Sequence, residues 1–302
     1  MRSWEDAWVE ALYGSAGFYR HHRPSAHFRT SPMVSDHFAE ALARLARTLG
    51  TDTVYDVGAG SGELAEALHR TAPDLKSTAI EIRSRPAELP GEIDWVPDLP
   101  ERLSGLVVAN EWLDTVPAPL VEVDPVGIPR IVLLGDTGES LGPAVSEADP
   151  AAAAWLEDWW PLDSPGQRAV VGLPRDDAAR DLVRRLGRGM LVLVDYGHLA
   201  GERPFLGGIR CYRDGRQVPT TLDATADVTA SVAVDSIARA VNGHWLSQSA
   251  ALAHLGVTPP QGGSLDDLVG AAQVRELMDP SGLGGFRWIV AASDGIESPL
   301  TG

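Results

Sequence analysis

The residues best suited to chemistry in this sequence follow four apolar runs, at the positions where buried strands end. The first run leads into Asp56-Val-Gly-Ala-Gly-Ser-Gly-Glu, the second into Glu81, the third into Asn110-Glu-Trp-Leu-Asp and the last into Asp195-Tyr-Gly-His. Glycines let backbone N–H groups approach a ligand, and carboxylates accept hydrogen bonds from hydroxyl groups or cations. Because ligands of open α/β sheets bind at the carboxyl ends of the strands, we expect these segments to share one edge.

The loop after the first run carries Gly58, Gly60 and Gly62 and is the strongest local motif. A dinucleotide-binding loop would have its third glycine at position 63, where a helix N-terminus binds pyrophosphate. Glu63 stands there instead, and it repels a pyrophosphate but tolerates the ammonium and sulfonium of S-adenosyl-L-methionine. The loop therefore predicts S-adenosyl-L-methionine as the cofactor, with Asp56 as partner of its ammonium, directly or through water. NAD binding and a plain structural turn are the alternatives.

Acidic residues further along the chain are candidates for the ribose and the adenine. Glu81 ends the second strand, where an acid can hydrogen-bond both ribose hydroxyls. The alternative is an ordinary exposed glutamate. Asp94 and Asp98 are weaker candidates near the adenine, because the third strand is poorly defined in the sequence.

Asn110, Glu111 and Asp114 leave the fourth strand where a transferred methyl group and its acceptor would meet. We predict a cofactor contact for Asn110 and catalytic roles for Glu111 and Asp114. Helix capping, which needs no ligand, is the alternative for Asn110 and Asp114.

Histidine supplies the candidate general base. His198 follows the fifth strand, and an imidazole can exchange a proton near neutral pH. His21, His22 and His27 lie in an N-terminal loop without the spacing of metal ligands, so we expect no metal site.

Composition narrows the class of protein. The 302 residues are 44% hydrophobic, which is enough to bury a core, and their formal net charge of −17 disfavours nucleic acid and anionic membranes as partners. Cys211 is the single cysteine, so an internal disulfide is excluded and a reducing compartment is indicated. The N-terminus reads as neither a signal peptide nor a membrane span, and we predict a cytoplasmic protein.

Alternating strand and helix patterns predict an α/β fold with a Rossmann-like open sheet. Strands are predicted at 53–57, 77–82, 105–109, 190–194 and 286–292, and helices at 3–13, 33–49, 174–187, 232–242 and 245–255, with a further helix after the glycine loop. Residues 119–134 read as a β-hairpin appended to the sheet, and 14–32 as an ordered loop. The tryptophan-rich stretch 136–166 and residues 200–230 give no clear pattern.

Several segments, in the same order along the chain, resemble the MidA group of class I methyltransferases. They are Gly17-Phe-Tyr, Phe28-Arg-Thr-Ser-Pro-Met-Val-Ser, the glycine loop from Asp56, Asn110-Glu-Trp-Leu-Asp-Thr-Val-Pro, Asp195-Tyr-Gly-His, Thr225-Ala-Asp-Val-Thr-Ala-Ser-Val, Gln248 to Gly256, and Leu277-Met-Asp-Pro-Ser-Gly-Leu-Gly. Together they span nearly the whole chain. The group contains protein arginine methyltransferases linked to the assembly of respiratory complex I.

The resemblance implies a class I sheet with an antiparallel final strand pair, S-adenosyl-L-methionine as donor and a protein arginine side chain as one possible acceptor. It implies an N-terminal helical cover, residues 1–50, and a methyltransferase domain, 51–302, with insertions near 118–166 and 199–260. It also implies cofactor contacts for Thr30, Ser31 and Pro32.

Two departures from the group bear on the acceptor. Ala26-His27 and Met33 stand where the group usually has acids, which weakens the case for a cationic guanidinium. Two alternatives therefore stay open. One is a small-molecule O- or N-methyltransferase with an apolar pocket lined by the tryptophans of 136–166, and the other is a non-catalytic assembly factor that binds the cofactor.

Overall fold

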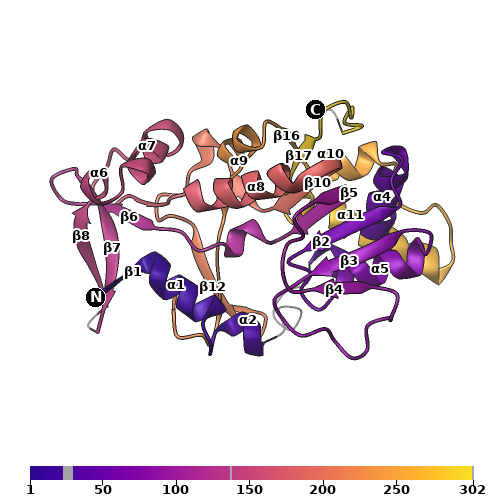
Figure 1. Cartoon of the computed structure of the whole chain (residues 1–302), viewed down its shortest axis with the longest axis horizontal. Coiled ribbons are helices and arrows are strands. Elements are labelled where there is room, and N and C mark those ends of the chain that lie inside the picture. Colours follow the sequence, from indigo (N-terminus) through magenta and orange to yellow (C-terminus); the bar gives the residue numbers. More distant parts are fainter. Residues whose placement is uncertain (23–29, 137, 301–302) are drawn as a thin grey trace. The chain divides into compact units, whose positions relative to one another are not determined.

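The structure is a computed structural model in which residues 1–22, 30–136 and 138–300 are described (Figure 1). The described residues form two compact units. The first contains 1–22, 113–179 and 197–240, and the second contains 30–112, 180–196 and 241–300. Segment 1–50, expected to be a helical cover, contributes to both units; the sequence-based division at residue 50 stays a prediction.

The second unit is built on a seven-stranded sheet of order β16-β17-β10-β5-β2-β3-β4. Its strands are β2 (Thr53–Val57), β3 (Lys76–Ile80), β4 (Asp94–Val96), β5 (Leu103–Asn110), β10 (Leu186–Asp195), β16 (His244–Ser247) and β17 (Arg287–Ala292). Strands β4, β3, β2, β5 and β10 are parallel, and β17 runs antiparallel between β10 and β16. The α/β open sheet and the antiparallel final pair are thus confirmed.

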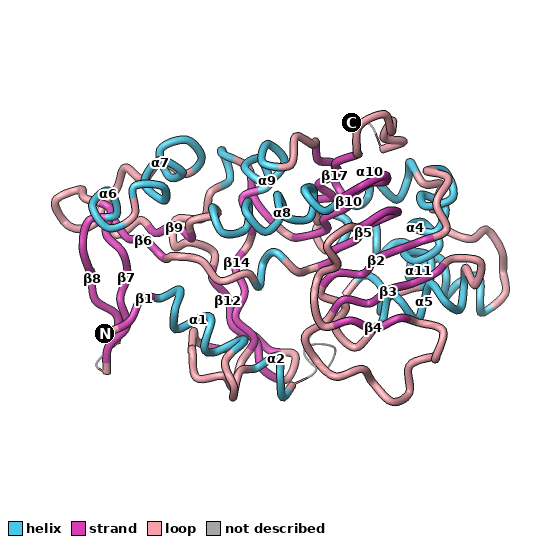
Figure 2. Tube along the Cα trace, in the orientation of Figure 1, coloured by secondary structure: helices cyan, strands magenta, loops and turns pink. Residues whose placement is uncertain are grey.

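Helices of the second unit cover one face of this sheet (Figure 2). They are α3 (Ser31–Val34), α4 (Asp36–Thr48), α5 (Glu63–Thr71), α10 (Gln248–His254), α11 (Leu265–Met278) and the short 3₁₀ turn η4 (Leu283–Gly285). Alternate strand residues such as Val54, Leu106 and Val192 pack against Phe38, Leu42 and Leu68 in one core. Helix α8 (Leu173–Arg185) begins in the first unit and ends in the second.

The predicted start of the helix 33–49 is wrong, because Ser35 interrupts the helix. Ser35 has an extended backbone, and its hydroxyl accepts a hydrogen bond from the His37 N–H, which begins α4 at Asp36. The preceding turn, α3, is a separate helix. The predicted loop 14–32 also contains a short helix, α2 (Phe18–His21), and its residues 23–29 lie outside the described part.

The first unit is mainly antiparallel β structure. Its five-stranded sheet contains β1 (Arg2–Ser3), β6 (Leu120–Val123), β7 (Pro129–Gly135), β8 (Gly138–Ala144) and β9 (Arg168–Val170); smaller sheets pair β11 (Gly197–His198) with β15 (Val232–Ala233), and β12 (Ile209–Arg213) with β13 (Arg216–Val218) and β14 (Asp227–Ala230). Its helices are α1 (Trp4–Tyr13), α2, α6 (Val145–Ala148), α7 (Pro150–Trp159) and α9 (Val234–Ala240), with 3₁₀ turns η2 (Leu113–Thr115) and η3 (Ala200–Glu202).

The hairpin at 119–134 is confirmed as β6 and β7, but its attachment to the central sheet was wrong. It pairs with β1, β8 and β9 in the separate five-stranded sheet. The reason is that Val121 of β6 has its own apolar partners, Trp155 and Trp160 among them, in a cluster of the first unit. The tryptophan-rich stretch thus forms β8, α6 and α7 and supplies a core.

Short strands explain why residues 200–230 gave no pattern. Strands β12, β13 and β14 are three to five residues long, which is too short for a clear alternation. The helix predicted at 245–255 begins only at Gln248, because residues 244–247 form the short strand β16. Among the described helices, none is long and apolar enough to cross a membrane.

Candidate active site

The parallel strands of the second unit end side by side. Val57 is paired with both Ile80 and Ala109, and Asn110 with Val194. The chain leaves β2 toward β3 and β4 in one direction, while β5 and β10 lie in the other. Strands β2 and β5 therefore flank the switch point where ligands of open sheets bind. The predicted gathering of the glycine loop, Glu81, Asn110 and Asp195 at one edge follows from this topology.

The glycine loop adopts a conformation that only glycine accepts readily. Gly58, Gly60 and Gly62 have φ values of 70°, 64° and 93°, in the left-handed region. At Gly58 a Cβ atom would also lie 2.6 Å from Cδ1 of Trp112. Backbone conformation and close approach together explain why glycine occurs at these positions.

Carboxylates accept the hydrogen bonds of two N–H groups in this loop. Gly60 donates to Oε2 of Glu81 at 3.0 Å, and Ser61 donates to Oε2 of Glu63 at 2.9 Å. A pyrophosphate would have to displace both acids, so the arrangement disfavours NAD. The acidic surroundings favour a ligand that brings positive charge.

Asp56 is the most perturbed group at this edge. Its side chain is buried at the end of β2, and Oδ2 accepts no hydrogen bond among the described residues. Burial, together with the charges of Glu63 and Glu81, raises the pKa of Asp56 to about 8. A buried carboxyl with one unpartnered oxygen, beside two further acids, favours a ligand with positive charge.

Glu81 is buried, which rules out the exposed glutamate considered as its alternative. Only 9% of the side chain is accessible, and Oε1 accepts the backbone N–H of Arg83 at 3.1 Å and its Nε at 3.4 Å. Asp94 and Asp98 are exposed, as the weaker prediction for them allowed. Trp95 lies between them in sequence, and its indole donates to the carbonyl of Arg83 at 2.9 Å.

Glu111 has a left-handed backbone, with φ of 53°, directly after β5. Its N–H donates to the carbonyl of Val194 at 2.7 Å, and its Oε1 accepts from Nδ2 of Asn110 at 3.2 Å. A non-glycine residue in this region costs on the order of 1–3 kcal/mol, and such strain is concentrated at functional sites. Oδ1 of Asn110 is buried and has no partner among the described residues.

Thr30, Ser31 and Pro32 form the start of α3, which contacts α5, the helix that follows the glycine loop. Ser31 is fully buried, and its hydroxyl donates to Gln248 at 3.2 Å. Gln248 in turn donates to the carbonyl of Leu277 and accepts from the indole of Trp288. Two segments singled out in the sequence are therefore joined in one buried network. Ala26 and His27, where one acid of the group is missing, lie outside the described residues, whereas Met33, where the other is missing, lies in α3.

Asp114 belongs to the first unit, in the turn η2. Its side chain is buried, and its carbonyl accepts a hydrogen bond from Nη2 of Arg175 at 3.1 Å. The Arg175 guanidinium also donates to the carbonyl of Val116 and lies 5.6 Å from the ring of Trp8. Hydrogen bonds from the buried Arg175 to backbone carbonyls thus hold the turn that carries Asp114 in place.

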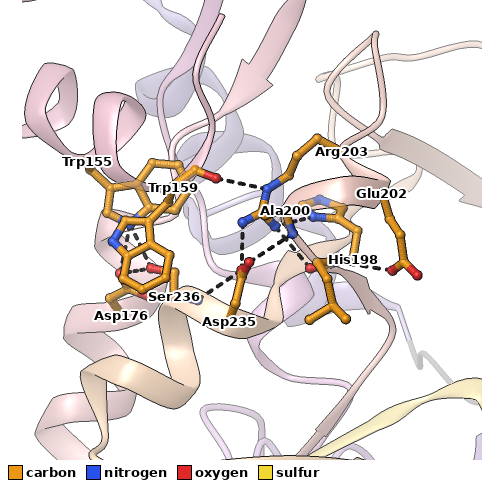
Figure 3. Close-up of polar contacts among 10 residues, drawn as sticks. Trp155, Trp159, Asp176, His198, Ala200, Glu202, Arg203, Asp235 and Ser236 are labelled. Atoms are coloured by element: carbon orange, nitrogen blue, oxygen red, sulfur yellow. Dashed lines mark hydrogen bonds and ion pairs between the residues drawn. The ribbon is translucent and has the colours of Figure 1, made fainter.

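His198 also lies in the first unit, where Arg203 binds it (Figure 3). Nη1 of Arg203 donates to Nδ1 of His198 at 2.7 Å, while Nη2 contacts Asp235 and Nε the carbonyl of Trp159. Because a guanidinium only donates, Nδ1 must be the acceptor and Nε2 carries the proton.

The prediction of His198 as a general base near neutral pH is therefore corrected. Burial and the positive charges of Arg203 and Arg175 lower the pKa of His198 to about 3. The imidazole is neutral at physiological pH, and its basic nitrogen is blocked by Arg203. Sequence alone could not show this, since Arg203 is five residues away in a stretch without pattern.

The described residues hold no group of three or more His, Cys, Asp or Glu side chains placed to bind a metal ion. His21 and His22 are exposed on the first unit, and His27 is outside the described part.

Comparison with known proteins identifies the family of this chain. A model of the Methyltransf_28 family, described as S-adenosyl-L-methionine-dependent methyltransferases, matches residues 33–249. The chain belongs to this family. S-adenosyl-L-methionine is accordingly the cofactor of this methyltransferase, and methyl transfer is its reaction. Among curated proteins, none matches the sequence.

Two crystal structures from Burkholderia thailandensis share the fold of this methyltransferase. One is a COG1565 superfamily member bound to S-adenosyl-homocysteine, 24% identical, with a TM-score of 0.80 over 98% of this chain and 89% of that chain. The other is a native structure of a COG1565 superfamily protein, 24% identical, with a TM-score of 0.80 over 99% and 90% of the two chains. The likeness shows a class I methyltransferase fold.

Sequence reasoning missed two residues at the cofactor edge of the methyltransferase. Trp112 packs under Gly58, and Gln248 joins the segment of Ser31 to α11 and β17. The signal for Trp112 was present, since it directly follows the polar pair at the end of β5. Gln248 begins a segment that resembles the MidA group, but its role could not be predicted, because its partners are 29 to 217 residues away in the chain.

Proposed function

We propose that this methyltransferase transfers the methyl group of S-adenosyl-L-methionine to an arginine side chain of a protein partner, as the MidA resemblance implies. The observation that carries the proposal is Glu111. A carboxylate with a strained backbone directly after β5, at the switch point, supports a role in binding a cationic acceptor.

The cofactor residues are proposed from the same edge of the sheet. Gly58, Gly60 and Gly62 let the backbone approach the donor, and Asp56 balances its ammonium. Glu81 accepts from the ribose hydroxyls, exchanging its present bond to the Gly60 N–H. Asn110 offers its unpaired Oδ1 to the donor. Thr30, Ser31 and Pro32 support this edge through the contact of α3 with α5.

Methyl transfer from a sulfonium is an in-line displacement, in which the donor supplies an electrophilic carbon and a neutral thioether leaves. The chain has to align the acceptor nitrogen with that carbon, and alignment alone contributes a large part of such rate enhancements. Glu111 would hold the guanidinium by charge-assisted hydrogen bonds and keep positive charge away from the reacting nitrogen. The proton lost by that nitrogen passes to water.

Asp114 is proposed as a second carboxylate on the acceptor side. His198 is proposed as a neutral hydrogen-bond donor through Nε2, because Arg203 blocks its other nitrogen. The small-molecule alternative needed a pocket lined by the tryptophans of 136–166. Trp155 and Trp160 instead fill a hydrophobic cluster, which favours the protein acceptor.

Single-turnover transfer of labelled methyl groups to proteins of a cell lysate tests the proposal. Glu111→Gln keeps the shape of the side chain but removes its charge, so methylation of protein should fall at least tenfold, because a hydrogen bond to a charged group contributes roughly 1.5–3 kcal/mol. Glu92→Gln, which removes an exposed charge of the same unit, is the matched control and should retain full activity.

Three results would contradict the proposal. Full activity of Glu111→Gln would remove the carboxylate from the mechanism. Label found only in small molecules would replace the protein acceptor, and absence of any product with an intact donor site would favour an assembly factor.

A further inference from the structure

The first unit contains a cavity of about 500 Å³ that none of the predicted site residues lines. Its walls come from several elements and loops that are far apart in sequence. They include Trp4 of α1, Glu122 of β6, Glu139 of β8, Arg168 of β9, Leu206, and Ile209 of β12. A volume of this size suits one side chain with its neighbouring backbone, and it is too small for a folded domain.

The charges in the cavity are unequal in number. Arg168 lies between two carboxylates, at 2.6 Å from Oε2 of Glu122 and 2.6 Å from Oε2 of Glu139. One guanidinium against two carboxylates leaves a net negative charge. The other oxygen of each carboxylate accepts no hydrogen bond from the described residues, so both acids can bind a second cation.

The position of Arg168 is fixed by the backbone. Its N–H donates to the carbonyl of Phe205 at 2.8 Å, and it forms a β-bridge to Leu206. Leu206 itself is 67% exposed. The cavity therefore combines preorganised charges with an apolar wall, which suits the aliphatic part of a long basic side chain.

Trp4 supplies an independent sign of a ligand. Only 4% of its surface is accessible, yet its indole N–H has no acceptor among the described residues. A buried donor without a partner is unfavourable, so a small shift of the indole toward a peptide carbonyl in the cavity would be stabilising.

We propose that this cavity binds a peptide segment of the protein substrate through an arginine side chain. Glu122 and Glu139 accept hydrogen bonds from its guanidinium, Leu206 and Ile209 contact its methylene groups, and Trp4 donates to a neighbouring backbone carbonyl. Arginine fits better than lysine, because its planar fork matches carboxylates in pairs. The net charge of −17 on the chain attracts such a segment.

The inference rests on the proposed function only for the identity of the partner as the methylated protein. The site itself lies within the first unit, whereas the proposed cofactor residues lie within the second. Binding of peptide and of cofactor can therefore be measured separately, and failure of one does not imply failure of the other.

Fluorescence anisotropy with a labelled peptide, Gly-Leu-Arg-Leu-Gly, tests the site, with citrulline in place of arginine as the neutral control peptide. The arginine peptide should bind at least tenfold more tightly than the citrulline peptide, and its affinity should fall with salt. Glu139→Gln and Glu122→Gln should each weaken it about tenfold, and Trp4→Phe about threefold. Glu147→Gln, an exposed acid on α6, should leave the affinity unchanged.

Equal binding of the two peptides, no binding of either, or equal affinity of Glu139→Gln and the unaltered protein would each overturn the inference. Thermal melting checks that the variants are folded, and the two glutamine variants keep the site testable if Trp4→Phe fails to fold. Calorimetry with S-adenosyl-L-methionine on the same samples should give unchanged affinity. Peptide binding without cofactor binding would sink the proposed function and retain this site.

Discussion

Replacing Asp56 by Asn should stabilise the cofactor-free protein at neutral pH while weakening cofactor binding. The carboxyl is buried, its Oδ2 has no partner among the described residues, and its pKa is raised to about 8 from a value of 3.8. The native state therefore keeps this proton between pH 4 and 8, where the unfolded chain loses it. Stability from this group is present below about pH 4 and is lost as pH rises toward 8.

The size of the effect follows from the shift. Each pH unit between the unfolded and folded pKa costs about 1.4 kcal/mol, so at pH 7 the native state loses up to about 4 kcal/mol relative to pH 4. Asparagine has no proton to lose, and the variant should gain at least about 1 kcal/mol relative to the unaltered protein on going from pH 4.5 to pH 8. Urea unfolding at both pH values measures the difference.

Any free-energy cost of fitting the amide into the site is the same at both pH values, so it cancels in the difference between them. Asp98→Asn, an exposed acid of the same unit, is the matched control. A stability difference between Asp56→Asn and the unaltered protein that is the same at pH 4.5 and pH 8 would refute the buried, protonated carboxyl. The same reasoning predicts that affinity for S-adenosyl-L-methionine rises with pH up to about 8, by at most tenfold per unit, and that Asp56→Asn flattens this dependence.

Two further predictions test the cofactor edge and the histidine. Glu81→Ala should weaken binding of S-adenosyl-homocysteine about tenfold or more by calorimetry, because a charged acceptor for two hydroxyls is lost; a loss below about twofold would return Glu81 to a structural role. Arg203→Met removes one partner of a partly buried ion pair with Asp235 and should cost about 1.5–3 kcal/mol in urea unfolding. The exposed Arg216→Met is its control, and equal stability of the two variants would contradict the role of Arg203 in holding His198.

The sequence predicted those parts of the fold that depend on local pattern. Strand β2, the glycine loop and α5 were recognised because glycines, apolar alternation and an acid at the helix start occur within twenty residues. The separate sheet of the first unit was missed, since the alternation of β6 and β7 does not show which sheet they join. Strand β9, the partner of β6, lies more than thirty residues beyond the hairpin in the chain.

In the candidate site, too, some residues could be proposed from local pattern, and other features depend on distant parts of the chain. Asp56, Glu81 and Asn110 could be proposed from the sequence because each lies at or just after the end of an apolar strand. The state of His198 could not be predicted, because it depends on Arg203, on burial and on Arg175, which packs from a distant helix. The cavity around Arg168 depends on long-range pairing of Glu122 and Glu139, which no local motif marks.

We propose that S-adenosyl-L-methionine binds at the glycine loop of the second unit. Isothermal titration with the cofactor should give one site in the unaltered protein and none in Gly60→Val, because valine disfavours a φ of 64°. Gly91→Val is the matched control, since that glycine is exposed with open space around its Cβ position, and it should bind normally. Undiminished affinity in a folded Gly60→Val protein would contradict the assignment of the loop.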